Sequence, residues 1–356
     1  MNPEKDTPLV SVLLPYYNEL TYIEPAIKSV LGQTWPRIEL IVVDDCSPDP
    51  AARLLIEALA EKYQFTLLRP AFNQGASKSL MMAFEASTGG YISIIAHDDL
   101  YPLDRMATMM KIILANDLDA LQGNGATFTD DNLAGATVIE DGALVEKLQA
   151  EGGQKAVADL ITSKDTVGCL LTTGALYKRR LLTELAWIRR KFLLDDWPFT
   201  IKVWQDYKAR FVPYVAFYYR SHAGNTHRNF WKWFPARVQV TSELIPQENK
   251  VHHLGTIFND VAHGLWQTKD HDAALRLALA ACFLYDGSTV RPEAGKAVRT
   301  LLREAAPKTR ADITAQMQTL LHQQTFSYKI VRGLSRLVSV FIWNKKLRKK
   351  IRSLYP

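Results

Sequence analysis

VSVLLPYYNE at residues 10–19 and IELIVVDD at residues 38–45 are the two stretches that decide the fold. Each begins with a short apolar run, which is typical of a buried strand, and each ends in polar or acidic residues. Between them, apolar residues recur at helical spacing over Tyr22–Leu31. The order strand, helix, strand predicts two parallel strands, because parallel neighbours need a long crossover connection and a helix usually supplies it.

The alternation continues through Ile95. Ala51–Tyr63 and Ser77–Ser87 have helical spacing, whereas Phe65–Leu68 and Tyr91–Ile95 are short apolar runs that predict strands. We therefore expect an α/β fold in which helices cover both faces of a mostly parallel sheet. In such folds ligands bind beyond the carboxyl ends of the strands.

Beyond this point the strand and helix signals are more widely spaced. Asp141–Gln154 contains glycines and fits either a helix or a mobile loop, whereas Leu193–Trp204 is predicted to be helical. Three further segments are predicted to be extended: Leu118–Phe128, Val167–Tyr177 and Phe211–Tyr219.

Acidic residues follow two of the predicted strands. Asp44 and Asp45 end the second strand, and Asp98 and Asp99 follow the fourth. Either pair by itself fits a polar turn or a helix start equally well. Two such pairs at one edge of a sheet are harder to explain without a partner, because close carboxylates repel unless a cation, a base or a sugar hydroxyl lies between them. A hard divalent cation is the natural neutraliser.

Two more polar segments are candidates for the same site. Asp195-Asp196 fits a solvated helix start or a third acidic point, because acids favour the first turn of a helix. The run Arg220–His227 fits a polar loop with stacked aromatic residues. It also fits a loop that holds phosphate through Arg220 and completes a metal shell through His222.

The order and spacing of these clusters resemble the family 2 glycosyltransferases of the GT-A fold, over about residues 8–230. Val10–Glu19 resembles the opening strand of that family and its P-x-Y-N-E turn. Ala96–Asp99 aligns with the D-x-D-D signature, with alanine in place of the first acid. The other matching segments are Ser29–Thr34 (S-[IVL]-L-x-Q-T), Glu39–Asp45 (E-[IL]-[IV]-[IV]-V-D-D), Asn73–Gly75 (N-x-G), Gly174–Arg180 (G-x-x-x-x-[KR]-R) and Asp195–Trp197 (E-D-[WY]).

The resemblance implies an inverting transfer of a sugar from a nucleotide-diphosphate sugar to a hydroxyl of a glycan or lipid-linked acceptor, in cell-surface polysaccharide synthesis. It implies that Asp45 binds a pyrimidine base, with UDP favoured and thymidine donors close behind. A divalent cation, Mn²⁺ or Mg²⁺, is implied at Asp98 and His222, with affinity lowered by Ala96. The residues implied for the nucleotide sugar are Pro15, Tyr17, Glu19, Asp44, Asp45, Lys78, Asp98, Asp99 and Arg220.

Asp196 is the implied catalytic base. Attack by a sugar hydroxyl on an anomeric carbon requires the hydroxyl proton to leave as the new bond forms, and a carboxylate within hydrogen-bond reach accepts it. The departing nucleoside diphosphate gains negative charge, which a cation and basic side chains stabilise. A single in-line displacement then inverts the configuration and needs no covalent nucleophile.

Basic residues are concentrated at the end of the chain. The net charge is +6 and the pI about 9.0, yet residues 325–356 hold nine of the 43 Lys and Arg residues and no acid. The body is therefore slightly acidic, and we expect no binding to nucleic acid. In the tail, apolar residues at helical spacing from Phe326 to Ile342 predict a basic amphipathic helix on an anionic membrane surface, or a helix packed on the protein with its far face solvated.

Three parts are expected: a GT-A catalytic domain over residues 1–235, a helical appendage over 236–324, and a membrane-associating tail over 325–356. The cysteines are three and far apart, and the start of the chain is charged without an apolar core. These features favour a cytoplasmic protein, peripherally associated with the inner face of the cell membrane.

Other nucleotide-binding classes lack their motifs here. A dinucleotide-binding enzyme would need G-x-G-x-x-G after the first strand, and Pro15–Leu31 contains no glycine. The alternative from another class is a non-catalytic sugar-nucleotide-binding or scaffolding protein with the same fold. Ala96 is the feature that favours it, and Asp196 speaks against it.

Overall fold

One mixed sheet organises the first part of the molecule. The structure is a computed structural model of the chain, and it describes residues 7–129, 133–163, 167–192, 196–222, 225, 237, 239–241, 243–249 and 253. Within these residues eight strands form the sheet in the order β3-β2-β1-β4-β7-β5-β6, with β8 paired to β5. The strands are β1 (Val10–Tyr16), β2 (Ile38–Asp44), β3 (Thr66–Leu68), β4 (Tyr91–Ile94), β5 (Ala120–Phe128), β6 (Thr137–Val138), β7 (Ala175–Lys178) and β8 (Ala209–Arg220).

The strand directions bring six carboxyl ends to one edge. β1 runs parallel to both β2 and β4, and β2 runs parallel to β3. β7 is antiparallel to β4 and to β5, so β5 points the same way as β4, and β8 is parallel to β5. The turns after β1, β2, β4 and β8 therefore lie at the same edge of the sheet, as expected for the ligand-binding edge of an α/β fold.

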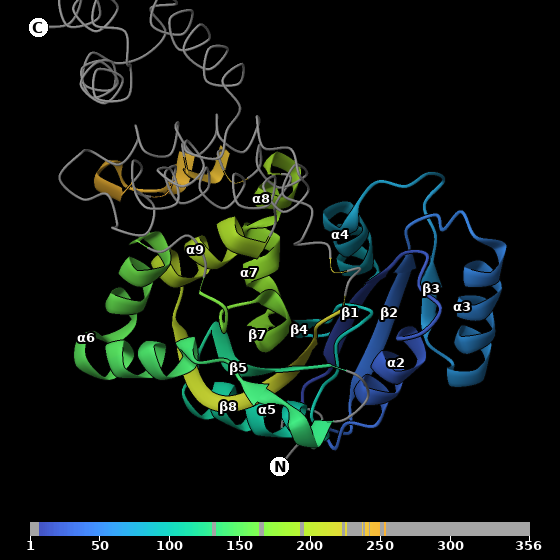
Figure 1. Cartoon of the computed structure of the whole chain (residues 1–356), viewed down its shortest axis with the longest axis horizontal. Helices are drawn as coiled ribbons and strands as arrows, with labels where there is room; N and C mark the ends of the chain where they lie inside the picture. Colours follow the sequence, from blue (N-terminus) through green and yellow to red (C-terminus); the bar gives the residue numbers. More distant parts are fainter. Residues whose placement is uncertain are drawn as a thin grey trace, which may run out of the picture. The chain divides into compact units, whose positions relative to one another are not determined.

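The helices bury apolar faces against this sheet. α2 buries Ile23, Ala26, Ile27 and Val30, residues at the spacing of one helical face, in the same core as the apolar residues of β1 and β2. Figure 1 shows α2 and α3 beside the β1–β3 end of the sheet, and α6 near β8. The helices are α2 (Ile23–Leu31), α3 (Pro50–Tyr63), α4 (Ala76–Ala86), α5 (Arg105–Ala115), α6 (Asp141–Ser163), α7 (Arg179–Glu184), α8 (Ala186–Lys191) and α9 (Asp196–Asp206), with short 3₁₀ turns η1 (Leu133–Gly135) and η2 (Thr172–Gly174).

The expected α/β fold is confirmed, and one strand prediction is wrong over most of its length. Val167–Tyr177 becomes extended only at β7. Before β7, the side-chain amide of Gln122 donates hydrogen bonds to the backbone carbonyls of Cys169 and Leu171, at 2.9 and 3.2 Å. Those carbonyls are satisfied by an amide instead of a neighbouring strand. The segment Asp141–Gln154 is helical and belongs to α6, which is kinked at Gly153.

The chain divides into two units, residues 1–226 and 227–356. In the second unit only scattered positions are described, among them helical residues at 239–241 and 247–249. The predicted appendage of residues 236–324 is therefore almost wholly outside the described residues, and the predicted membrane tail of 325–356 is entirely outside them. In the described part of the chain, every helix is too short or too polar to cross a bilayer.

Candidate active site

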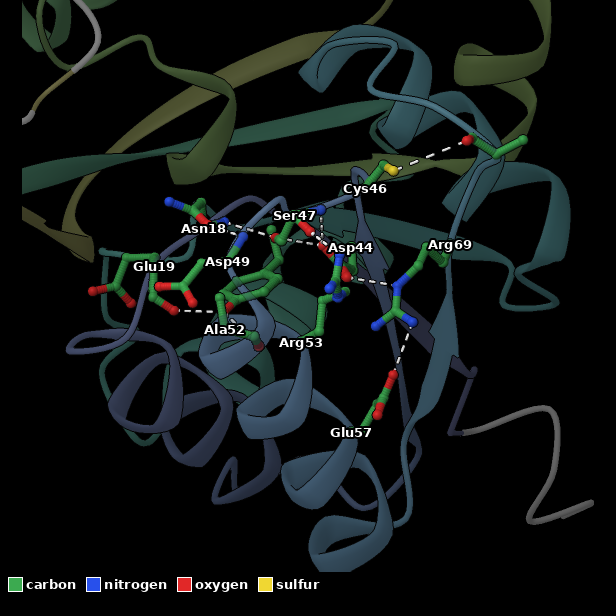
Figure 2. Close-up of polar contacts among 12 residues, drawn as sticks. Asn18, Glu19, Asp44, Cys46, Ser47, Asp49, Ala52, Arg53, Glu57 and Arg69 are labelled. Carbon is green, nitrogen blue, oxygen red and sulfur yellow. Dashed lines mark hydrogen bonds and ion pairs between the residues drawn. The ribbon is translucent and has the colours of Figure 1, made fainter.

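The turns after β1 and β2 are tied to each other by Ser47. Its hydroxyl donates to Asp44 Oδ1 at 2.6 Å and accepts from the backbone N–H of Asn18 at 2.8 Å (Figure 2). A second hydrogen bond joins the same two turns, because the Oδ1 of Asn18 accepts from the backbone N–H of Asp49 at 3.0 Å. Asn18 and Cys46 adopt left-handed backbone conformations with φ of 51° and 58°, which make both turns sharp. The two turns thus form one hydrogen-bonded unit at the carboxyl edge.

Asp44 is buried beneath this unit. None of the residue is exposed, and besides Ser47 its carboxylate pairs with Arg69 Nε at 2.7 Å. Arg69 extends the network to Glu57 on α3, at 2.8 Å from Nη1 (Figure 2). Asp44, predicted to bind the nucleotide sugar, therefore has its carboxylate engaged by protein groups and supports the turn from below.

Asp45 reaches a different segment. Its two carboxylate oxygens accept from the backbone N–H groups of Gln74 and Gly75, at 2.9 and 2.8 Å. Gly75 has φ of 88° and precedes α4, so Asp45 fixes the start of that helix. Lys78 lies in the first turn of α4 with its side chain exposed. The predicted base-binding acid and the predicted diphosphate-binding lysine are thus linked through one loop.

The turn after β1 contains three predicted nucleotide-sugar residues in different environments. Pro15 is partly buried in β1, whereas Tyr17 is 44% exposed. Glu19 caps α2: its carboxylate accepts from the backbone N–H groups of Thr21, Tyr22 and Ile23 at 2.5, 2.7 and 2.9 Å. A carboxylate at this position satisfies orphan amides and complements the helix dipole. The structure therefore gives Glu19 a defined task within the protein.

The structure brings Asp98 and His222 together across 124 residues of sequence, with His222 Nε2 2.9 Å from Asp98 Oδ2. An isolated bridge between Leu100 and Tyr218 joins the segment after β4 to β8 and explains the approach. Arg220 Nε donates to the backbone carbonyl of Asp98 at 3.0 Å. The two predicted metal ligands are therefore neighbours.

Asn225 closes the loop around this pair. Its Oδ1 accepts from the backbone N–H of His222 at 2.7 Å, and its side-chain amide donates to the carbonyl of Arg220 at 3.1 Å. The same amide lies 3.4 Å from Asp98 Oδ2. Asn225 thus holds the backbone that carries both Arg220 and His222.

Arg220, predicted to bind phosphate, is 2% exposed. Its guanidinium carbon lies 4.4 Å from the ring centroid of Tyr22 and 4.5 Å from that of Phe128, so the cation is held between two aromatic faces. Together with its bond to Asp98, this arrangement makes Arg220 part of the frame that positions the Asp98 turn.

Asp99 lies under the same turn. Burial and the neighbouring Asp98 carboxylate raise the pKa of Asp99 well above its ordinary value, although hydrogen bonds from Arg220 and Thr173 act in the other direction. The carbonyl of Thr173 accepts from the fully buried Arg105, at 3.1 Å from Nη2. The pKa of Asp99 is thus raised chiefly by burial, and the buried Arg105 holds the neighbouring backbone at Thr173.

A divalent cation fits the Asp98–His222 pair. Two ligand atoms at adjacent positions of an octahedral ion, with bonds of about 2.1 Å, lie about 3 Å apart, and the observed separation is 2.9 Å. Among the described residues no cluster of three or more His, Cys, Asp or Glu side chains could hold a metal ion. Such an ion would therefore take its remaining ligands from substrate phosphates and water, as Mg²⁺ commonly does.

Asp196, the predicted catalytic base, is the first residue of α9. Its carboxylate accepts from the backbone N–H of Trp197 at 2.7 Å, and the residue is partly exposed. It stands on a different element from the Asp98 turn. Its role as base stays a prediction.

Sequence reasoning missed several residues that shape the site. Ser47 and Asn18 join the two turns, and Tyr22 contacts Arg220 and also lies 5.1 Å from His222, ring to ring. Asn18 stands within a matched motif, so its position was a usable signal, and Ser47 lies two residues beyond the motif Glu39–Asp45. Tyr22 gave none, because its partners are about 200 residues away in the sequence.

Residues 11–185 match the family model described as glycosyl transferase family 2. An uncharacterized glycosyltransferase of Nostoc sp. is 27% identical over an alignment of 238 residues that covers 61% of this chain and 66% of the relative. The Escherichia coli UDP-Glc:alpha-D-GlcNAc-diphosphoundecaprenol beta-1,3-glucosyltransferase WfgD is 27% identical over 143 residues, 40% of this chain and 56% of that protein. The matched regions span 66%, 48% and 42% of the lengths of three curated relatives.

A solved structure shares the architecture. Mannosyltransferase PcManGT of Pyrobaculum calidifontis, in complex with GDP-Man and Mn²⁺, matches with a TM-score of 0.50 at 20% sequence identity. The match covers 95% of this chain and 88% of that one. At this identity the likeness concerns the fold alone, and it agrees with the expected GT-A architecture.

Proposed function

The chain belongs to glycosyltransferase family 2, and from this premise we propose that it moves a sugar from a nucleotide-diphosphate donor to a hydroxyl of a cell-surface glycan or its lipid-linked precursor. The observation that carries the proposal is the contact of Asp98 with His222 at the sheet edge where the Asp44–Asp45 turn also lies. A nucleotide and its diphosphate can extend along this edge, from the turn after β2 to the turn after β4.

The donor in this proposal is a uridine diphosphate sugar. Asp45 supports it, because a carboxylate held by two backbone amides keeps lone pairs that can accept from the ring N–H of uracil. The name of WfgD specifies UDP-Glc, while PcManGT was solved with GDP-Man, so relatives of this architecture take different bases. The base is therefore the first property to measure.

In the proposed mechanism, Asp98 and His222 hold a divalent cation that, when bound, neutralises the charge of the leaving diphosphate. Lys78, exposed at the start of α4, adds a positive charge on the diphosphate side. Arg220 keeps the Asp98 turn in place through its bond to the Asp98 carbonyl. These residues bind and orient the donor, and they favour the diphosphate as a leaving group.

Asp196 takes the proton from the attacking hydroxyl. A base on the acceptor side and a diphosphate leaving on the other produce one in-line displacement, which inverts the anomeric configuration. The proposed acceptor is a glycan or a lipid-linked sugar, as in the acceptor that the name of WfgD specifies. The basic tail of residues 325–356 would bring the enzyme to an anionic membrane on the cytoplasmic side, within reach of a lipid-linked acceptor.

A panel of nucleotide sugars tests the function. We expect the wild-type chain to hydrolyse or transfer at least one UDP-sugar in the presence of Mn²⁺ or Mg²⁺. Asp196→Asn should lose about 10²–10⁴-fold in turnover, the usual contribution of a general base, while its affinity for UDP stays unchanged. Full activity in Asp196→Asn would remove this residue as the base. Binding of UDP without turnover of any nucleotide sugar would favour the non-catalytic scaffold.

A further inference from the structure

Tyr22 stands outside every predicted set of site residues, yet its ring contacts two side chains at the cation-binding end of the site. The ring centroid lies 5.1 Å from that of the His222 imidazole, with the planes inclined at 49°. The Arg220 guanidinium carbon lies 4.4 Å from the same ring. Both of these side chains are bonded to Asp98, so one aromatic ring touches both groups that fix the Asp98 turn.

The position of Tyr22 is set by the capped start of α2. Tyr22 precedes the helix, and its backbone N–H donates to Glu19 Oε2 at 2.7 Å. The backbone carbonyl of Glu19 in turn accepts from the buried hydroxyl of Tyr16 at 2.5 Å. The ring therefore projects from a backbone that is anchored in the sheet, and its contacts with Arg220 and His222 limit where it can lie.

Arg220 is the last residue of β8, and His222 lies two residues beyond it. Strand pairing therefore does not fix the His222 side chain, and contacts from other elements are needed to orient it. Asn225 fixes the His222 backbone but does not determine the rotation of the imidazole. Groups around a metal ligand that orient its ring tune metal affinity. Arg220 is packed between Tyr22 and Phe128, so loss of the Tyr22 ring removes one of its two faces.

We propose that Tyr22 is a positioning residue for the cation-binding pair: its ring holds the His222 imidazole beside the Asp98 carboxylate. The inference rests on the proposed function, since it takes Asp98 and His222 as the cation ligands. It extends that function by linking the P-x-Y-N-E turn, through Glu19 and the start of α2, to the cation end of the donor site.

The test measures Mn²⁺ binding to the full chain in the presence of UDP, by the loss of the electron paramagnetic resonance signal of free Mn²⁺. Tyr22→Leu should weaken Mn²⁺ binding about tenfold, the lower end for residues that orient metal ligands. Tyr22→Phe keeps the ring and should bind as the wild type does. Tyr207→Leu is the matched control, because Tyr207 is also a partly buried tyrosine but pairs with Glu184 away from this edge.

A double-mutant cycle separates positioning from a general effect on folding. In a His222→Ala background, Tyr22→Leu should add less than about twofold to the loss of Mn²⁺ binding, because the imidazole that it orients is gone. Independent additive losses would overturn the inference. If Tyr22→Leu lowers the melting midpoint, Tyr22→Met, which fills similar space without a ring, repeats the comparison.

The two levels of the proposal fail differently. Unchanged Mn²⁺ binding in Tyr22→Leu, with weakened binding in His222→Ala, overturns the positioning role and leaves the proposed function intact. Wild-type binding in His222→Ala overturns the cation assignment itself, and the positioning role with it.

Discussion

Replacing Asp44 by asparagine removes the charge from the centre of the turn network and keeps its shape. The carboxylate is fully buried and accepts three hydrogen bonds, two from Ser47 and one from Arg69. The side-chain oxygen of asparagine can still accept the hydrogen bonds from Ser47. Its NH₂ group then faces Arg69 Nε, and because both groups are donors, no hydrogen bond forms between them. Loss of one charge-assisted bond costs about 1.5–3 kcal/mol. The Arg69 side chain is 32% exposed and retains its ion pair with Glu57, so water and Glu57 compensate part of this loss. We therefore expect Asp44→Asn to lower the free energy of unfolding by about 2 kcal/mol.

The melting midpoint of the full chain, followed by differential scanning fluorimetry, measures the effect. At 2–4 °C per kcal/mol for a unit of this size, Asp44→Asn should lower the midpoint by about 4–8 °C. Asp159→Asn is the matched control, because that carboxylate pairs with Lys155 at 2.7 Å while both side chains are largely exposed, at 65% and 82%. Its midpoint should change by less than about 2 °C. Equal shifts in the two variants would refute the account of Asp44 as a buried anchor.

Three further perturbations follow from the same structure. Burial raises the pKa of Glu39, but the hydrogen bonds that its carboxylate accepts lower the pKa by more than burial raises it. The pKa of Glu39 therefore lies below the ordinary value of 4.5. The stability that the charged Glu39 contributes is fully present above pH 4.5 and is lost as the pH falls through the lowered pKa. The difference between the urea midpoints of the wild type and Glu39→Gln should therefore be smaller at pH 4 than at pH 7. A difference that stays constant contradicts this. Gly75→Ala should cost about 1–3 kcal/mol in thermal unfolding, because φ there is 88°, whereas Gly90→Ala, which also meets open space, should be nearly neutral; equal effects would argue against backbone strain at Gly75. Arg105→Met should lower stability in urea by about 2 kcal/mol, since the Thr173 carbonyl loses its donor and the Ser93 hydroxyl and the Ala175 carbonyl each lose one of their partners; an unchanged midpoint would show that these acceptors find other donors.

The regular part of the fold was predictable from local sequence. β1, β2 and β4 coincide with short apolar runs, and α2 with a face of apolar residues, because burial on a sheet imposes these periodicities. The parallel direction followed from the helices between the strands. α5 was not predicted, although it buries Met106, Met109 and Met110 at helical spacing.

The segment Val167–Tyr177 shows where local sequence fails. Its apolar composition suits a strand, but a strand also needs a neighbour with free backbone groups. Gln122, about 50 residues earlier, supplies the donors for part of this segment with a side-chain amide, and only β7 joins the sheet. Nothing in the composition of the segment reveals that competition.

The candidate site divides along the same line. The sequence by itself indicated that the acids after β2 and β4 share one carboxyl edge, because strand direction and turn position are properties of nearby residues. Only the tertiary structure decided how each one is used: Asp44 and Glu19 have their carboxylates engaged by protein hydrogen bonds, while Asp98 meets His222 across 124 residues. The availability of a carboxylate depends on the donors around it, and most of those come from distant parts of the chain.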